Sequence, residues 1–158
     1  MRGSNRAAKA PVHDVVHGSS YIKSRRPEAR RIMHTLKWII LALALFQGSW
    51  LAFDGSRALI TGDYTTPSSG PRAGQLGPWS RIVSALGFAP RSTFIKCVHL
   101  FLGIAWLVAL IVFIVRPASG WWFIFGCAVA SLWYLPIGTL LSIVVIALLL
   151  TAQIRNLL

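Results

Sequence analysis

The stretch GWWFIFGCAVASLWYLPIGTLLSIVVIALLLTAQ, residues 120–153, decides the fold of this chain. It holds no charged side chain, but as a single helix it would measure about 51 Å at 1.5 Å per residue, far longer than a bilayer core of about 30 Å. Pro136 and Gly138 near its middle are typical of a turn. The stretch therefore predicts a tight helical hairpin, whose turn joins spans at 120–135 and 137–153.

Two pairs of aromatic residues mark the ends of this hairpin. Trp121 and Trp122 lie near its start, and Trp133 and Tyr134 lie at its turn. Tryptophan and tyrosine prefer membrane–water interfaces because their rings join an apolar body to a polar tip. We expect one pair at each interface, in contact with lipid or with a partner.

Composition places the rest of the chain in the same class. Of its 158 residues, 55% are hydrophobic and 13% are charged, whereas soluble domains carry about 25% charged residues. Apolar stretches at 38–53 and 94–115 predict two further spans. The expected fold is therefore an all-α integral membrane protein with four transmembrane helices. Pro27 suits the first position of a helix and no breaker follows in Glu28–Lys37, so the first helix is expected to project beyond the membrane.

The distribution of charge predicts the orientation of these helices. The chain has 16 Lys and Arg against 4 Asp and Glu, and nine of the 16 bases precede the first span. Under the positive-inside rule the N-terminus is cytoplasmic, and four crossings return the C-terminus to the same side, with Arg116 and Arg155. The predicted topology is N-in and C-in, in an inner membrane. The N-terminal bases are Arg2, Arg6, Lys9, Lys23, Arg25, Arg26, Arg30, Arg31 and Lys37.

Two regions follow from this topology. Residues 1–27 are expected to form a flexible, basic cytoplasmic tail, and residues 28–158 the four-helix transmembrane domain. Each base near the surface attracts anionic lipid by about 1 kcal/mol, so anionic lipids are the expected partners of the tail. Nucleic acid is not an expected partner, because the tail has neither interleaved aromatic residues nor a helix-turn-helix pattern.

The loop at 54–93 is expected on the outer side, with a tight turn at Gly62–Asp63. Within it, Gly77–Gly87 predicts a short amphipathic helix that Pro78 opens and Gly87 closes. Two interpretations stay open for its apolar face: the helix rests on the outer leaflet or on its own bundle, or it docks a partner. That face consists of Trp79, Ile82, Val83 and Leu86, which recur at helical spacing.

Four short segments resemble small bacterial polytopic membrane proteins to which no activity is securely assigned. They read DGSRAL (54–59), GDY (62–64), GQLGPW (74–79) and WYLPIGT (133–139). The resemblance covers about residues 38–153. It implies a polytopic topology and transfers no catalytic, metal or cofactor residue to this chain.

The sequence shows no pattern of residues typical of a catalytic or metal site. The spacings of metal centres are absent, and the histidines are scattered along the chain. Asp54 is expected to be a hydrogen-bonding group at a helix end or in the loop, paired with Arg57. Because the four expected spans contain no carboxylate, no ion or proton pathway is expected. The four histidines are His13, His17, His34 and His99.

His99 carries the only cofactor hypothesis. It is expected near the outer interface, either as a hydrogen-bonded side chain or as a ligand to a haem or pigment metal. No cofactor is required for the leading functional hypothesis, a non-catalytic accessory subunit that contacts other membrane subunits. An energy-transducing complex, photosynthetic or respiratory, is the expected host. The alternative is a stand-alone small membrane protein of envelope or transport function, and an enzyme is not expected.

Overall fold

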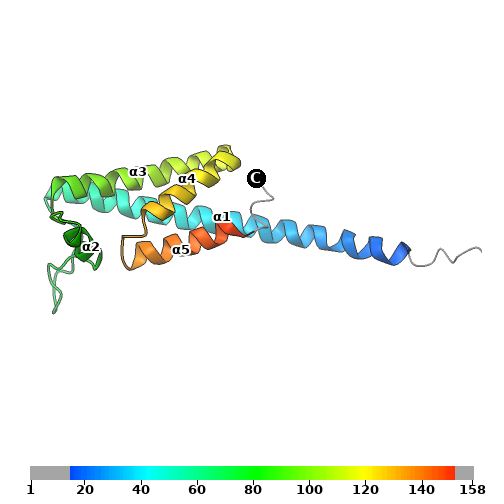
Figure 1. Cartoon of the computed structure of the whole chain (residues 1–158), viewed down its shortest axis with the longest axis horizontal. Coiled ribbons are helices and arrows are strands. Elements are labelled where there is room, and N and C mark those ends of the chain that lie inside the picture. Colours follow the sequence, from blue (N-terminus) through cyan, green and yellow to red (C-terminus); the bar gives the residue numbers. More distant parts are fainter. Residues whose placement is uncertain (1–14, 152–158) are drawn as a thin grey trace, which may run out of the picture.

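The computed structural model describes residues 15–151. All regular structure within this range is helical (Figure 1). The helices are α1 (Val15–Thr61), α2 (Trp79–Ala85), α3 (Thr93–Val115), α4 (Pro117–Ala130) and α5 (Ile137–Leu150).

Helix α1 is much longer than the first predicted span. Its 47 residues correspond to about 70 Å, and it ends only where Gly62 adopts a φ of 88°. The helix begins at Val15, so Pro27 lies inside it rather than at its first position. Residues 15–27 of the predicted flexible tail are therefore helical, while residues 1–14 lie outside the described part. The extension past Phe53 also moves Asp54 from the predicted outer loop into the helix.

Two helical segments, His34–Thr61 and Thr93–Val115, are long and apolar enough to cross a membrane. Helices α4 and α5 are apolar but have 14 residues each, about 21 Å, which is shorter than a bilayer core of about 30 Å. They form the predicted hairpin, although its turn occupies 131–136 rather than 135–138. The four predicted spans thus correspond to two long helices and one short hairpin.

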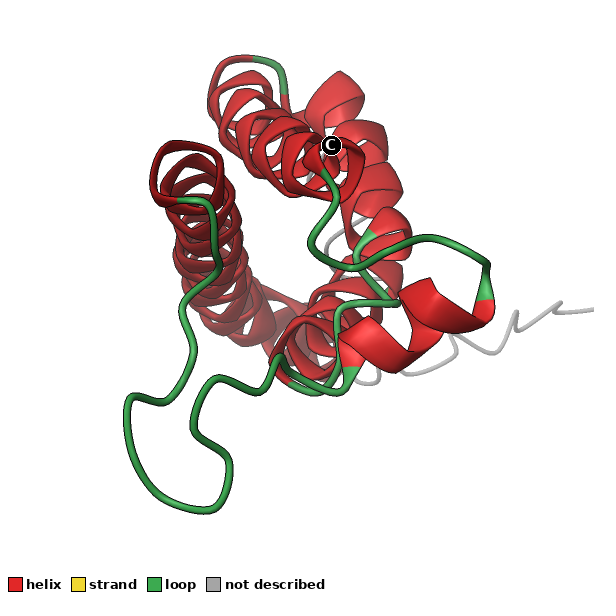
Figure 2. Cartoon of the chain, turned by 90° about the vertical axis from the view of Figure 1, so that its left-hand side faces the viewer, coloured by secondary structure: helices red, strands yellow, loops and turns green. Residues whose placement is uncertain are grey.

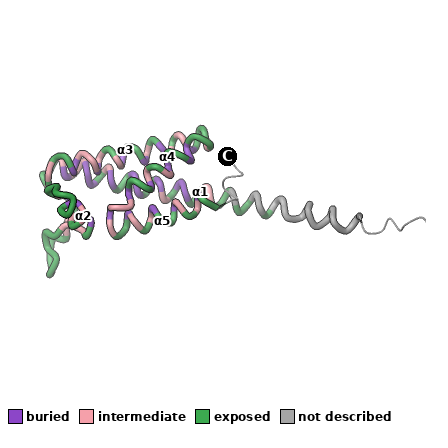
Figure 3. Tube along the Cα trace, in the orientation of Figure 1, coloured by how far each residue is buried: buried purple, intermediate pink, exposed green. Residues whose placement is uncertain are grey.

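Helices α1, α3, α4 and α5 close into a bundle. Helix α3 packs along α1, α4 packs on α3, and α5 contacts both α4 and α1 (Figure 1). The hairpin stops short of the end where a loop joins α1 to α3. Helix α2 and its loops lie at that end, as the end-on view shows (Figure 2). Buried positions line the facing sides of the helices, and exposed positions line their outer sides (Figure 3).

Glycines allow α1 and α3 to approach closely. A Cβ atom on Gly103 of α3 would overlap the backbone of Ala52 in α1. A Cβ on Gly55 of α1 would lie 2.6 Å from the Leu100 nitrogen of α3. Helices that associate in membranes commonly use small residues in this way, because close backbones gain dispersion contacts that lipid cannot replace.

Three tryptophans tie the hairpin to itself and to the longer helices. The indole N–H of Trp106 in α3 donates to Ser131 Oγ at 2.9 Å. The Trp121 N–H in α4 donates to the Leu149 carbonyl of α5 at 3.1 Å, and the Trp50 N–H in α1 donates to Tyr134 Oη at 3.2 Å. Each such bond contributes about 1 kcal/mol net; the Trp50 and Trp106 bonds hold the turn against α1 and α3, and the Trp121 bond joins the two arms of the hairpin.

Candidate functional site

The end of the bundle that carries α2 holds a cluster of aromatic rings. Trp79 lies at its centre, with its ring centroid 4.8 Å from His99 and 5.0 Å from Tyr64. The rings of Trp133 and Tyr134, from the hairpin turn, lie 6.1 and 6.0 Å from Trp79. We call these five residues the aromatic cap. Segments far apart in the sequence thus meet above the hairpin turn.

Helix α2 positions Trp79 in the cap. The predicted amphipathic helix is present, and Gly87 with a φ of 84° follows it. Trp79 and Val83 are buried, Ile82 is half-buried, and Leu86 is 69% exposed. Leu86 is therefore not part of the seated face as predicted, because the helix ends at Ala85 before a further turn forms. The buried face rests on the protein's own aromatic rings.

His99 is fully buried inside the cap, at 0% exposure. Its Nδ1 donates to the Ile95 carbonyl at 2.9 Å and lies 3.3 Å from Tyr64 Oη. This bond assigns the proton to Nδ1, so Nε2 carries the lone pair, and Nε2 has no partner among the described residues. Aromatic rings surround the imidazole, and ligation of a haem or pigment metal would require them to move.

A cavity of about 150 Å³ lies beside the cap, between α1, α2 and the hairpin turn. Asp54 lines it and is 3% exposed. Its Oδ1 accepts the N–H of Thr65 at 2.8 Å, and among the described residues no protein partner meets Oδ2. Asp54 is therefore a buried carboxylate that faces a cavity, and the predicted pairing with Arg57 is wrong. The lining consists of Trp50, Asp54, Tyr64, Thr65, Leu76, Gly77, Trp79, Tyr134, Leu135, Pro136 and Ile137.

Other charged groups at this end of the molecule are engaged elsewhere. Arg57 Nη1 donates to the Asp63 carbonyl at 3.2 Å, and Lys96 Nζ donates to the Gly62 carbonyl at 2.5 Å. Arg91 forms an ion pair with Asp63 at 2.9 Å. The hydrogen bond from Arg91 lowers the pKa of Asp63, and burial raises the pKa of the Tyr64 hydroxyl. These contacts fix the loop that follows α1.

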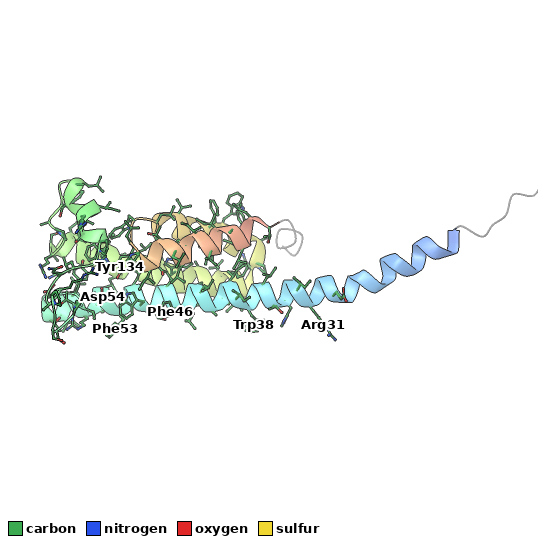
Figure 4. All side chains as sticks on the ribbon, turned by 90° about the horizontal axis from the view of Figure 1, so that it is seen from below. Arg31, Trp38, Phe46, Phe53, Asp54 and Tyr134 are labelled. Carbon is green, nitrogen blue, oxygen red and sulfur yellow. The ribbon has the colours of Figure 1, made fainter. Side chains whose placement is uncertain are left out.

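The side of α1 away from the bundle forms a second candidate surface (Figure 4). Bulky apolar residues recur on it at every seventh position, and residues with small side chains occupy the positions between them. We call this surface the outer seam. The bulky residues are Ile32, Ile39, Phe46, Phe53 and Ile60, all exposed. The small ones are Thr35, Ala42 and Ser49, which are exposed, and Ser56, which is half-buried.

The remaining predicted contact residues have different surroundings. Trp121 is buried and stacks on Phe125 with ring centroids 5.3 Å apart, whereas Trp122 is 69% exposed. Trp133 is half-buried and Tyr134 is buried in the cap, so protein contacts cover Tyr134 and part of Trp133. Cys97 and Cys127 are free thiols. In the described part of the chain, no three His, Cys, Asp or Glu side chains gather as metal ligands would. His13 falls outside that part.

Comparison of the chain with protein families, characterised proteins and solved structures gives no match. The structure itself therefore supplies the arguments for function. Sequence reasoning found Trp79, Val83 and His99 but missed the cavity at Asp54 and the outer seam. The spacing of seven was readable in the sequence, but the opposite side of α1 is equally apolar, so nothing distinguished the inner side from the outer.

Proposed function

We propose that the chain is a multi-pass inner-membrane protein that acts as a non-catalytic subunit of a larger membrane assembly. Large apolar side chains cover the outside of the bundle, which supports an apolar surrounding for α1 and α3 through α5. Phe101, Ile111, Leu140 and Ile143 are examples, each more than half exposed. Such a surface is stable where lipid or other helices replace water.

The outer seam is the observation that supports a neighbouring helix packed against α1. Lipid requires only that a helix surface be apolar and imposes no repeat of seven. A second helix does impose one, since bulky residues of one helix fill gaps beside small residues of the other. Phe46 and Phe53 flanking Ser49 provide such an alternation on α1. The seam reaches from Ile32 to Ile60, nearly the whole apolar length of the helix.

The short hairpin also supports a role within the membrane. Non-helical backbone at membrane depth is tolerated only where protein covers it. The turn at 131–136 lies below the aromatic cap, and Trp50 and Trp106 donate hydrogen bonds to it. In the proposed arrangement α1 and α3 cross the bilayer, the hairpin enters from the side of the N-terminus, and α2 covers its turn. Both termini then lie on the cytoplasmic side.

Enlarging a small residue of the seam should release the neighbour. Ala42→Leu adds apolar volume on the outer side of α1, which lipid accepts but a closely packed helix does not. We expect the tagged wild type, purified from native membranes in mild detergent, to elute as a discrete large assembly. Ala42→Leu should elute largely as the free 17.4 kDa chain.

Ala105→Leu is the matched control, because Ala105 is also exposed but lies on α3. It should co-purify with the assembly as the wild type does. A wild-type chain that elutes alone would favour the alternative, a stand-alone small membrane protein of envelope or transport function. Haem or pigment absorbance in the purified assembly would place it in the energy-transducing class.

Cysteine labelling in intact cells should show the proposed topology. In a background with Cys97 and Cys127 replaced by alanine, a cysteine at Ser69 in the loop should react with an impermeant maleimide. A cysteine at Ser4 should react only after the membrane is opened, because the basic N-terminal segment is retained on the cytoplasmic side. If the cysteine at position 4 is labelled in intact cells, the N-terminus lies outside and the predicted orientation is wrong.

A further inference from the structure

Asp54 is a buried carboxylate without a cationic partner. The one ion pair in the described part of the chain joins Arg91 to Asp63, and neither residue lines the cavity beside Asp54. Arg57, one turn further along α1, is bound to a backbone carbonyl instead. Burial of most of a carboxylate is costly unless a cation or hydrogen-bond donors compensate it; the Thr65 N–H binds Oδ1, and Oδ2 stays open to the cavity.

Aromatic rings wall the cavity that Asp54 faces. Trp50 comes from α1, Tyr64 from the following loop, Trp79 from α2 and Tyr134 from the hairpin turn. Figure 4 shows Asp54 and Tyr134 on the inner side of α1, opposite the outer seam. Tyr134 Oη already accepts the Trp50 N–H, which fixes two of the walls relative to each other.

We propose that this cavity binds a methylated ammonium group. The faces of aromatic rings attract cations, most strongly where water is excluded, and the carboxylate of Asp54 supplies the opposite charge. A volume of about 150 Å³ is comparable to a cavity that holds a benzene-sized molecule, which suits an ammonium with methyl substituents. Thr65, Pro136 and Ile137 are exposed at its rim, so the cavity has a route to the surface.

The lining selects a methylated ammonium over a primary one. A primary ammonium has three N–H donors and keeps strong hydration, so it needs several acceptors in a site that excludes water. The lining side chains that carry an acceptor oxygen are those of Asp54, Tyr64, Thr65 and Tyr134, and Asp54 alone among them is a carboxylate, while the other lining residues are apolar or aromatic. A quaternary ammonium has no donors to satisfy, and its methyl groups pack against the rings. The inference does not depend on the proposed membrane assembly.

Calorimetric titration of the purified chain in dodecyl maltoside, with choline as the probe, tests this site. The matched neutral compound is 3,3-dimethylbutan-1-ol, which has the shape of choline with carbon in place of the charged nitrogen. We expect choline to bind at least about tenfold more tightly, which corresponds to about 1.4 kcal/mol. Equal binding of the two compounds, or no binding of choline, would overturn the proposal.

Two carboxylate variants locate the binding. Asp54→Asn retains an acceptor for the Thr65 N–H but removes the charge, so choline affinity should fall about tenfold or more. Glu28→Gln removes an exposed carboxylate of α1 that does not line the cavity, and its choline affinity should match the wild type. Unchanged affinity in Asp54→Asn contradicts the assignment.

If Asp54→Asn is not monodisperse on gel filtration, a third variant tests whether choline binds in this cavity. Trp50→Leu removes one aromatic wall and keeps the carboxylate. Weaker choline binding in this variant supports the site, and unchanged binding overturns it.

The ammonium group could belong to a free solute or to a lipid headgroup, and nanodiscs distinguish the two. In discs of phosphatidylglycerol alone, the wild type should bind choline as it does in detergent. If discs that also contain phosphatidylcholine abolish this binding, the lipid headgroup occupies the cavity. If binding persists there, the ligand is a free cation. Failure to bind choline in phosphatidylglycerol discs would count against the site.

Discussion

Gly103→Val is expected to separate α1 from α3 and to leave little correctly folded protein. Any Cβ at this position would overlap the backbone of Ala52, and backbone cannot rotate away as a side chain can. Overpacking of a well-packed site costs about 1–3 kcal/mol, and overlap with a helix backbone places this variant at or above the upper end. Thermal unfolding in detergent, followed by circular dichroism, should show a large fall in Tm and a loss of monodispersity.

Gly126→Val is the matched control for this variant. Gly126 is an exposed helical glycine of α4, and a Cβ there meets nothing within 4 Å. Both variants introduce the same β-branched residue into a helix, so any difference between them reports the α1–α3 contact. Comparable melting of the two proteins would mean that α1 and α3 do not cross at Gly103.

Trp79→Ala should open the end of the bundle that carries α2. The side chain is 4% exposed and contacts the rings of Tyr64, His99, Trp133 and Tyr134. Removing a buried tryptophan costs about 3–5 kcal/mol, and a helix as short as α2 depends on packing to stay folded. Hydrogen exchange in residues 77–87 should rise strongly, while exchange in the middle of α3 should change little.

Leu86→Ala provides the comparison on the same segment. Its side chain is 69% exposed, so we expect a change in stability within about 0.5 kcal/mol and exchange like that of the wild type. Protection of residues 77–87 that survives Trp79→Ala would show that the aromatic cap does not hold α2.

The helical class and the hairpin were predictable, because long apolar runs and a proline–glycine turn report them directly. The ends of α1 were not. Hydropathy drops after Phe53, but the chain from Asp54 to Thr61 contains no residue that forces the helix to stop, and Gly62 is the first to do so with a positive φ. The apolar stretch ends at Phe53, whereas the helix continues to Thr61, so hydropathy does not mark the end of the helix. That difference placed Asp54 in a loop instead of inside the bundle.

Three of the five residues of the aromatic cap, Trp79, Trp133 and Tyr134, could be picked out from the sequence. The spacing of Trp79 and Val83 identified the seated face of α2, and the turn identified Trp133 and Tyr134 as a pair. The sequence could not show that these segments enclose His99, because the contact depends on how far the hairpin reaches along α1. A hairpin with longer arms would have carried its turn past His99, whereas arms of 14 residues bring the turn beneath α2.

Gln47 of α1 is a buried polar residue whose surroundings are completed only late in synthesis. Its amide lies against Gly138, where a Cβ would come within 3.0 Å of Nε2, and Gly138 belongs to α5. During synthesis α1 emerges first and α5 last, so this polar group meets its cover only when the chain is nearly complete. An uncovered amide in hydrocarbon is unfavourable. Gly138 shields Nε2 without giving it a hydrogen-bond partner, and we expect chains truncated before Gly138, which lack this cover, to be degraded sooner.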